Sequence, residues 1–359
     1  MKKISYMICA LLLSLLVGCG VSEGDDPDYS PNDRAQANHK NWAFVETEEG
    51  CYYQSDTMVY FIPRGSDSAY PLCGKPNCTH EDESCNAYCG WGYGYYNGLL
   101  YYITPSENYD SIELVRMNLD GSNHTVVSHY EPQECFQFYF HHGMLLMIIS
   151  GNDAPLLEDR KDRFLVIDLS DYSCREVFSE YFAEGKRMEI MHFSGYRIYG
   201  YSDSYQNSGE NCCLMEWNIE TGESRVLLDQ LIATGYATES SYYYVEPAAG
   251  FRELNLTTGE VVRRGTPMED AWWMSADEEF IYVVGFGRQN GTEYTLSFYS
   301  HDYELLDQVE MKNDIYYGYV SSDRLYFVNN ADEVYCPIAY YIDKADIGSG
   351  RLELKPFND

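Results

Sequence analysis

Residues 92–123 read GYGYYNGLLYYITPSENYDSIELVRMNLDGSN, and this stretch decides the fold of the chain. Its first part, Gly92–Ile103, is rich in tyrosine and leucine and is interrupted by Asn97-Gly98. Its second part begins at Leu114 and reaches the turn Leu-Asp-Gly-Ser at residues 119–122. Asn-Gly and Asp-Gly pairs favour tight hairpins because both residues tolerate positive φ, whereas aromatic and branched residues favour strands. The stretch therefore predicts two successive β-hairpins.

The first hairpin of this stretch recurs along the chain. Each copy has an aromatic-rich strand, a short turn and a second strand that ends in an aromatic or apolar cluster, and a second hairpin follows most copies. The clusters are spaced by 41, 46, 52, 44, 39 and 44 residues. The copies span Gly50–Ile62, Gly92–Ile103, Phe136–Ile149, Ile190–Tyr201, Ala237–Val245, Trp273–Val284 and Tyr316–Val328, with clusters centred on Tyr60, Tyr101, Met147, Tyr199, Tyr243, Tyr282 and Tyr326.

A four-stranded unit that repeats about every 40–45 residues is typical of the blades of a β-propeller. We therefore predict an all-β chain whose single domain, residues 42–359, is a β-propeller of about seven four-stranded blades, with six and eight as the neighbouring counts. We expect Trp42–Glu46 to lend a strand to the last unit around Arg351–Pro356, because closing the ring in this way removes an exposed strand edge. A pair of β-sandwiches is the alternative fold.

One of these units carries a family resemblance. The sequence LVRMNLDGSN at residues 114–123 resembles a repeat of the TolB-type propellers and of related domain-of-unknown-function propellers in secreted proteins of Firmicutes, with echoes at Asp168 and Asn218. The resemblance implies a binding or scaffolding propeller. Its motif is structural, because the hairpin requires the Asp-Gly turn. It therefore carries over no catalytic residues.

Residues 1–18 have the organisation of a lipoprotein signal peptide. Met1–Lys3 is basic, and Ile4–Val17 is an apolar run that is too short to span a bilayer as a helix, which needs about 20 residues. Leu16-Val17-Gly18-Cys19 resembles the lipobox of bacterial lipoproteins. This resemblance implies cleavage before Cys19, transfer of a diacylglycerol to its thiol, and a lipid anchor on the extracytoplasmic face of the cell membrane.

Residues 19–41 comprise the lipidated cysteine and a tether. The tether has almost no apolar side chains, so it cannot bury enough surface to offset the entropy of ordering. The whole chain has 24 Lys and Arg against 57 Asp and Glu, which gives a net charge of −33. This charge excludes a general electrostatic affinity for nucleic acid or anionic headgroups. We therefore expect membrane contact through the lipid anchor only and no nucleic-acid partner.

The sharpest local motif lies between the first and second units. It reads CGKPNCTHEDESCNAYC over residues 73–89 and contains Cys73, Cys78, His80, Cys85 and Cys89. Its Leu-Cys-x4-Cys-x-His-x4-Cys pattern resembles an element of uncharacterised clostridial lipoprotein propellers, and no function is transferred with that resemblance.

Three interpretations of this motif stay open. Cys73, Cys78, His80 and Cys85 supply three thiolates and one imidazole, which suits a closed structural zinc site. Disulfides are the second interpretation, because an exported chain permits them and the cysteine number is even. Free thiols in the envelope of an anaerobe are the third. Of 12 cysteines, Cys9 leaves with the leader and Cys19 is lipidated, so 10 remain: Cys51, Cys73, Cys78, Cys85, Cys89, Cys135, Cys174, Cys212, Cys213 and Cys336.

The sequence carries no catalytic signature. The eight histidines form no His-Glu-x-x-His motif, and there is neither a Gly-x-Ser-x-Gly elbow nor a phosphate-binding loop. We expect His141-His142 at a surface hairpin tip before Gly143. The tryptophans Trp91, Trp217, Trp272 and Trp273 are expected in the core between blades, with a sugar-stacking surface as the alternative.

Together these features predict a cell-surface lipoprotein whose propeller binds a protein or glycan partner without catalysis. Loops on one rim of the rigid scaffold would make the contacts. An extracytoplasmic propeller enzyme acting on polysaccharide is the first alternative, because 57 acidic residues offer many carboxylate pairs. A metal- or redox-responsive envelope protein that uses Cys73–Cys89 is the second.

Overall fold

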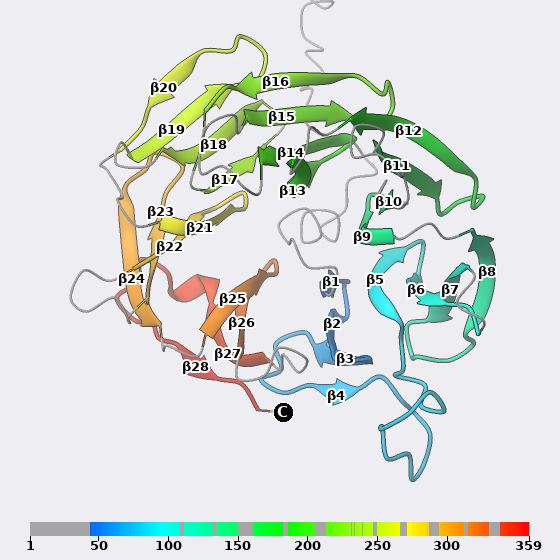
Figure 1. Cartoon of the computed structure of the whole chain (residues 1–359). Coiled ribbons are helices and arrows are strands. Elements are labelled where there is room, and N and C mark those ends of the chain that lie inside the picture. The colour runs from blue at the N-terminus through cyan, green and yellow to red at the C-terminus, as the bar shows by residue number, and fades with distance from the viewer. Residues whose placement is uncertain are drawn as a thin grey trace, which may run out of the picture.

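The structure, a computed structural model, describes residues 44–358 apart from 108–110, 132–134, 150–160, 182–185, 205–212, 231, 233, 239, 247–249, 266–270, 287–293, 312–314 and 330–337. Within this part of the chain, 28 strands form seven four-stranded antiparallel sheets that follow one another around a ring (Figure 1). The prediction of an all-β propeller with seven blades is confirmed. The expected leader, Cys19 and tether lie outside the described residues.

Each blade consists of four strands that are consecutive in the sequence. Blade 1 contains β1 (Phe44–Glu46), β2 (Gly50–Ser55), β3 (Met58–Pro63) and β4 (Tyr70–Pro71), and blade 2 contains β5 (Trp91–Tyr96), β6 (Leu99–Pro105), β7 (Ile112–Asn118) and β8 (Thr125–Tyr130). Blade 3 contains β9 (Cys135–His141), β10 (Met144–Ile149), β11 (Lys161–Asp168) and β12 (Cys174–Tyr181), and blade 4 contains β13 (Lys186–Ser194), β14 (Arg197–Ser204), β15 (Cys213–Asn218) and β16 (Ser224–Leu228).

The remaining three blades have the same order. Blade 5 contains β17 (Thr234–Ala237), β18 (Ser241–Glu246), β19 (Gly250–Asn255) and β20 (Val261–Arg263), and blade 6 contains β21 (Ala271–Ala276), β22 (Ile281–Phe286), β23 (Tyr294–Tyr299) and β24 (Leu305–Met311). Blade 7 contains β25 (Ile315–Val320), β26 (Arg324–Asn329), β27 (Ile338–Asp343), the 3₁₀ turn η2 (Lys344–Asp346) and β28 (Lys355–Pro356). No helix among the described residues is long and apolar enough to cross a membrane.

The middle strands of the blades are buried because neighbouring blades cover both faces of each sheet. All six residues of β10, with the sequence MLLMII, are buried. In the outer strands β8 and β24, most residues are exposed or half-buried. A strand that is covered on both faces has a continuous apolar sequence instead of an alternating one. This burial explains the apolar clusters that mark the repeat.

The core is divided among clusters at the contacts between neighbouring blades. One cluster joins Ile148 and Phe164 of blade 3 to Phe193 and Trp217 of blade 4, and all four side chains are buried. Burial of each such side chain contributes about 1.5–3 kcal/mol. The high tyrosine content partly serves the same purpose, because nine tyrosines among the described residues are 2 % exposed or less: Tyr52, Tyr53, Tyr93, Tyr199, Tyr242, Tyr244, Tyr282, Tyr319 and Tyr326.

The ring closes without an exchange of strands between its first and last blades. Phe44–Glu46 pairs with Cys51–Tyr53 of its own blade, and the last blade is completed by its own β28. The expected strand from Trp42–Glu46 beside Arg351–Pro356 is therefore wrong for residues 44–46. The reason is local. A short turn folds β1 back onto the next strand, and pairing two adjacent segments costs little conformational entropy because the loop that closes is short.

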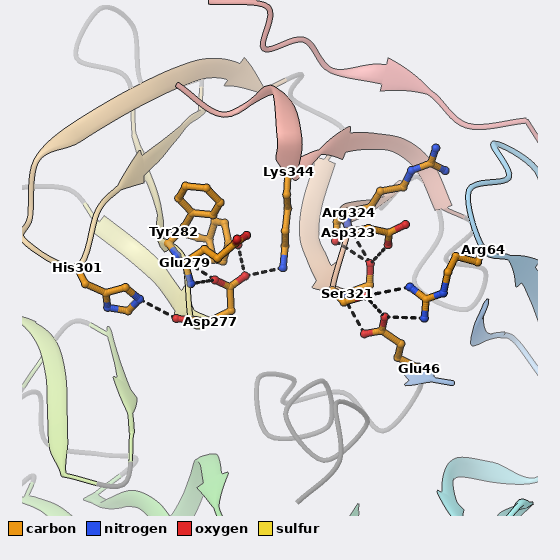
Figure 2. A network of polar contacts seen from close by, with 12 residues as sticks. Glu46, Arg64, Asp277, Glu279, Tyr282, His301, Ser321, Asp323, Arg324 and Lys344 are labelled. Atoms are coloured by element: carbon orange, nitrogen blue, oxygen red, sulfur yellow. Dashed lines mark hydrogen bonds and ion pairs between the residues drawn. The ribbon is translucent and has the colours of Figure 1, made fainter. Parts of the chain in front are cut away.

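Side chains of blades 1 and 7 make part of the closure. Glu46 is buried and accepts a hydrogen bond from the backbone N–H of Ser322 at 2.9 Å. The guanidinium of Arg64 lies 3.3 Å from the same carboxylate (Figure 2). Phe44 stacks on Tyr319 of blade 7, with 4.8 Å between the ring centroids. The hydrogen bond from Ser322 to Glu46 and the aromatic contact between Phe44 and Tyr319 thus join the two blades.

Arg324 of blade 7 makes the other part. Its Nε donates to Asp343 Oδ1 at 2.7 Å, and its terminal nitrogens donate to the carbonyl oxygens of Gly65, at 3.4 Å, and Ser66. The guanidinium also lies over the ring of Tyr341, at 4.3 Å from its centroid. Arg324 therefore ties its own blade to the chain between β3 and β4.

Candidate metal centre

Residues 72–90 connect blade 1 to blade 2 and project outward from the ring between β4 and β5 (Figure 1). The segment is longer than the other links between blades, such as residues 312–314 between β24 and β25. It consists of turns and bends with one isolated bridge, between Met58 and Tyr88. We call this segment the 72–90 loop.

The two ends of the 72–90 loop complete the outer edge of blade 1. The short strand β4 pairs only with Tyr60 and Phe61 of β3. Beyond them, Val59 accepts a hydrogen bond from the N–H of Leu72 at 2.9 Å and donates its own N–H to the carbonyl of Ala87 at 2.8 Å. The loop is therefore fixed to the propeller on both sides of its exposed part.

Four side chains of the loop converge on one point. A ligand atom from each of Cys73, Cys78, His80 and Cys85 lies within 4.8 Å of the other three. Nδ1 of His80 lies 3.2 Å from Sγ of Cys85. A tetrahedral zinc ion, with bonds of about 2.0–2.3 Å, holds its ligand atoms roughly 3.3–3.8 Å apart. The four residues proposed from the sequence thus come together at a spacing that fits one such ion.

Two sharp reversals of the backbone make this convergence possible. Asn77 and His80 have φ values of 61° and 57°, in the left-handed region that asparagine and histidine adopt more readily than branched residues do. The ammonium group of Lys75 donates to the carbonyl of Ser84, and the N–H of Ser84 donates to Asp82 Oδ1 at 2.8 Å. The first bond joins the two arms of the loop, and the second fixes the turn within one arm.

The thiols of the cluster stand in different electrostatic environments. Burial raises the pKa of Cys85 to about 11, although its sulfur accepts a hydrogen bond from the N–H of Ala87. Burial also opposes ionisation of Cys73, but hydrogen bonds from the backbone at Lys75 and Asn86 lower the pKa of this thiol below its ordinary value. A bound cation favours thiolates over thiols, because it supplies the positive charge that they need.

The composition of the cluster defines what it can do. Three sulfurs and one imidazole nitrogen fill all four positions of a tetrahedral ion, which leaves no open position for water or substrate. A site of this kind crosslinks the chain and performs no reaction.

Cys89 lies apart from the four ligands. It is fully buried in the core between blades 1 and 2, beside Met58 and Leu100, and this burial raises its pKa. No disulfide joins any of the seven cysteines whose side chains the structure describes: Cys51, Cys73, Cys78, Cys85, Cys89, Cys174 and Cys213. The disulfide interpretation thus finds no support among them. Cys19, Cys212, Cys336 and the side chain of Cys135 lie outside the described part of the chain.

The histidine pair His141-His142 lies at a hairpin tip, as predicted, but only one of the two is accessible. His141 is 3 % exposed, stacks on Phe193 with 5.0 Å between centroids, and contacts the carbonyl of Gly195 through Nε2 at 3.1 Å. The expected exposure is therefore wrong for His141, because the first hairpin of blade 4 covers it.

The tryptophans divide between core and surface. Trp217 is completely buried between blades 3 and 4, as expected. Trp91, at the start of β5, is 48 % exposed, and Trp273 is half-buried. The side chain of Trp272 lies outside the described residues. The three described tryptophan side chains therefore form no common sugar-stacking surface. Trp91 is the exposed one among them and follows directly after the 72–90 loop.

A second polar cluster, which the sequence did not single out, joins blades 6 and 7. The buried Lys344 lies 2.5 Å from Asp277, whose carboxylate also accepts a hydrogen bond from Tyr282 (Figure 2). Burial opposes ionisation of Asp277, but the adjacent ammonium prevails and lowers its pKa. His301 contacts the carbonyl of Asp277 at 2.8 Å. These contacts join neighbouring blades, and their role is structural.

The seven blades make the protein a β-propeller, and solved structures share this fold. One of two prolyl endopeptidases aligns at 10% identity and a TM-score of 0.57, over 90% of this chain and 51% of that one. A Mycobacterium tuberculosis puromycin-hydrolysing peptidase aligns at 13% identity and a TM-score of 0.52, over 92% of this chain and 55% of that one. This chain spans about half the length of these two peptidases, and the likeness shows the fold alone.

The computationally designed protein Ika8 is also similar, at 9% identity and a TM-score of 0.49, over 88% of this chain and 86% of that one. No protein-family model matches the chain, and no curated protein matches it. The function is therefore inferred from the residues of the chain.

Proposed function

We propose that this chain is a lipid-anchored binding propeller on the extracytoplasmic face of the cell membrane, and that a zinc ion orders the loop with which it contacts its partner. The observation that carries this proposal is the convergence of Cys73, Cys78, His80 and Cys85 within 4.8 Å at the rim of the ring. The partner is a protein or glycan at the cell surface, and the propeller binds it without turnover.

The 72–90 loop needs a crosslink because its middle part has little apolar surface to bury. Residues 74–77 and 79–84 are exposed apart from the half-buried His80, and four of them are charged. Burial cannot offset the conformational entropy that such a segment loses on ordering. A structural metal ion supplies the missing free energy. A loop ordered in advance then binds a partner at a lower entropic cost than a flexible one.

The location rests on the leader. The basic start, the apolar run and the Leu16–Cys19 lipobox together favour export and lipidation. Acyl chains contribute about 0.8 kcal/mol per buried CH₂, so an anchor with two or more chains holds a protein stably at a membrane. The test is the full chain with Cys19→Ser, which should leave the membrane fraction for the soluble fraction while the wild type stays. Equal membrane association of both would remove the anchor from this proposal.

The metal and the contact surface are tested together. The exported form of residues 20–359 is compared with its Cys78→Ser variant, and Cys174→Ser serves as the control because Cys174 is an exposed thiol outside the cluster. We expect one zinc ion per chain in the wild type and the control, and none in Cys78→Ser.

Labelled wild-type protein should bind intact cells of the source in a saturable manner, and Cys78→Ser should bind several-fold more weakly. If the wild type binds zinc but Cys78→Ser lacks zinc and still binds cells as tightly as the wild type, the loop is not the contact surface. Absence of saturable binding by all three proteins would remove the binding function itself.

A further inference from the structure

A cavity of about 790 Å³ opens at the ends of blades 2, 3 and 4. It lies where the first strand of each of these blades turns into the second, and where the third strands of blades 3 and 4 turn into the fourth. Its volume falls within the range of about 300–1,000 Å³ that is usual for small-molecule sites. The 72–90 loop contributes nothing to its lining.

Successive blades each place an aromatic ring in this cavity. Tyr96, His142 and Tyr196 all lie at the first hairpin turns of their blades. The rings of His142 and Tyr196 meet edge to face, with 5.0 Å between centroids. Tyr196 is 37 % exposed, so its ring remains accessible from solvent.

The position of Tyr96 depends on a glycine. Gly143 has a φ of 68°, and a Cβ atom added to it would lie 2.8 Å from the ring of Tyr96. The ring can therefore lie against the turn of blade 3 only because residue 143 has no side chain. This contact places the ring of Tyr96 against the turn that carries His142, and all three aromatic residues line the same cavity.

Polar side chains line the rest of the cavity. Arg175 donates to the carbonyl of Ile219 at 3.0 Å, which holds its guanidinium at the boundary between blades 3 and 4. Asp168 accepts a hydrogen bond from the N–H of Ser170 at 2.8 Å, and the side chain of Glu220 lies on the opposite blade. One cation and two carboxylates thus offer both donors and acceptors.

This combination favours one chemical class of ligand. A sugar ring has an apolar C–H face that stacks on an aromatic ring and a rim of hydroxyl groups that hydrogen-bond in the plane. An apolar ligand or a hydrophobic peptide anchor would find only two aliphatic walls here, from Met144 and Val166. An anionic ligand would meet two carboxylates in a chain with a net charge of −33.

We propose that the cavity between blades 2, 3 and 4 binds a neutral oligosaccharide, with Tyr96, His142 and Tyr196 stacking on its rings. This inference rests on the proposed binding function, since it names glycan as the ligand class, but it assigns the binding to a surface separate from the 72–90 loop. Arg175, Asp168 and Glu220 then fix the orientation of the hydroxyl groups.

The experiment is calorimetric titration of the exported form of residues 20–359 with chitotetraose, cellotetraose, maltotetraose and mannotetraose. Tetragalacturonate is the anionic probe, and a pool of random peptides represents the alternative class. We expect binding of at least one neutral oligosaccharide. Tyr196→Ala and Gly143→Ala should each weaken it at least about tenfold, and Tyr196→Phe should retain it, because stacking uses the ring. The control is Tyr70→Ala, an exposed tyrosine of blade 1 outside the cavity, which should change nothing.

Circular dichroism of each variant shows that it is folded. No heat of binding with any neutral sugar at millimolar concentration, binding of the uronate or the peptides alone, or equal affinity in Tyr196→Ala would each overturn the inference. These failures differ from failure of the proposed function, because zinc content and membrane anchoring are measured independently. Conversely, sugar binding that survives in a Cys78→Ser protein without zinc would support the cavity as a separate site.

Discussion

The two junctions on either side of blade 1 cover an exposed strand edge with different kinds of contact. Blades 1 and 7 both have an outer strand of only two residues, Tyr70–Pro71 and Lys355–Pro356, so both leave a strand edge partly uncovered. At the junction of blades 7 and 1, Asn358 donates its N–H to Asp67 at 2.8 Å, and Arg324 bonds the neighbouring carbonyls. At the junction of blades 1 and 2, the 72–90 loop covers the edge.

The difference lies in what each junction needs from outside the chain. The junction of blades 7 and 1 carries its own counter-charges, since Arg324 and Lys355 both pair with Asp343. The junction of blades 1 and 2 gathers three thiols and an imidazole, which gain a counter-charge only from a bound cation. We therefore expect the first junction to respond to pH and the second to respond to metal.

Metal removal should have the largest effect. Zinc at a thousandfold excess over its dissociation constant stabilises the folded state by about 4 kcal/mol. Urea unfolding of the wild type with zinc and with a chelator should show this difference in the free energy of unfolding. Cys78→Ser should unfold alike under both conditions, while the exposed-thiol control Cys174→Ser behaves as the wild type. Equal stability of the wild type with and without zinc would contradict a structural ion.

Arg324→Met should have the next largest effect. It removes the guanidinium from Asp343 and from the carbonyl groups of Gly65 and Ser66, and the loss of these charge-assisted hydrogen bonds costs about 3 kcal/mol. Thermal or urea unfolding measures this cost, which should be independent of zinc. The matched control is Arg351→Met, because Arg351 is 74 % exposed in its pair with Asp346 and such pairs contribute about 1 kcal/mol or less. A similar cost for both variants would argue against a closing role for Arg324.

Gly121→Ala probes the packing of the 72–90 loop against blade 2. Gly121 has a φ of 75°, and a Cβ atom there would lie 2.1 Å from the carbonyl oxygen of Leu72. We expect a loss of about 2 kcal/mol, of which the positive φ alone accounts for about 1. Gly98→Ala separates the two contributions, since Gly98 has a φ of 79° with nothing within 4 Å of its added Cβ. Equal destabilisation would mean that the contact with Leu72 has no energetic weight.

The smallest effect is expected from acid. Burial opposes ionisation of Asp343, but Lys355 and Arg324 lower its pKa below the ordinary value of 3.8. A carboxylate with a depressed pKa stabilises the fold above its unfolded-state pKa, and this stabilisation is lost as the pH falls through the folded-state value. Asp343→Asn should therefore be less stable than the wild type at pH 7 by about 1 kcal/mol.

The two stability curves should begin to converge as the pH falls below about 4 and should meet below the folded-state pKa of Asp343. Urea unfolding over a pH series measures both curves, with zinc held constant. A difference between the curves that does not change with pH would assign the effect of Asp343 to packing instead of charge.

The outcome for the metal ligands shows where sequence reasoning succeeds and where it stops. Cys73, Cys78, His80 and Cys85 are close in the sequence, so their spacing alone suggested a ligand set, and the fold brings them together. Cys89 is equally close in the sequence, yet the pairing of residues 87–89 with the start of β3 draws it into the core. That choice depends on β4 being too short to cover the edge of β3.

The candidate glycan cavity was not recognisable from the sequence. Tyr96, His142 and Tyr196 each look like an ordinary hairpin residue. They become one surface only because consecutive blades place equivalent turns side by side. The burial of His141 cannot be predicted from the sequence for the same reason, because the residue that packs on it, Phe193, belongs to the next blade.

The sequence alone predicts most strands and turns and a count of about seven blades, because hairpin signals such as Asn97-Gly98 are local and the repeat gives the approximate number of units. Only the tertiary structure decided how the ring closes, which thiols meet and which aromatic residues share a cavity. These features depend on contacts between segments that are distant in the sequence or on competition for the same strand edge. Glu46 and Ser322 are an example, since they touch across almost the whole length of the folded chain. Local secondary-structure propensities do not predict such contacts, because these contacts form only when one blade packs against another.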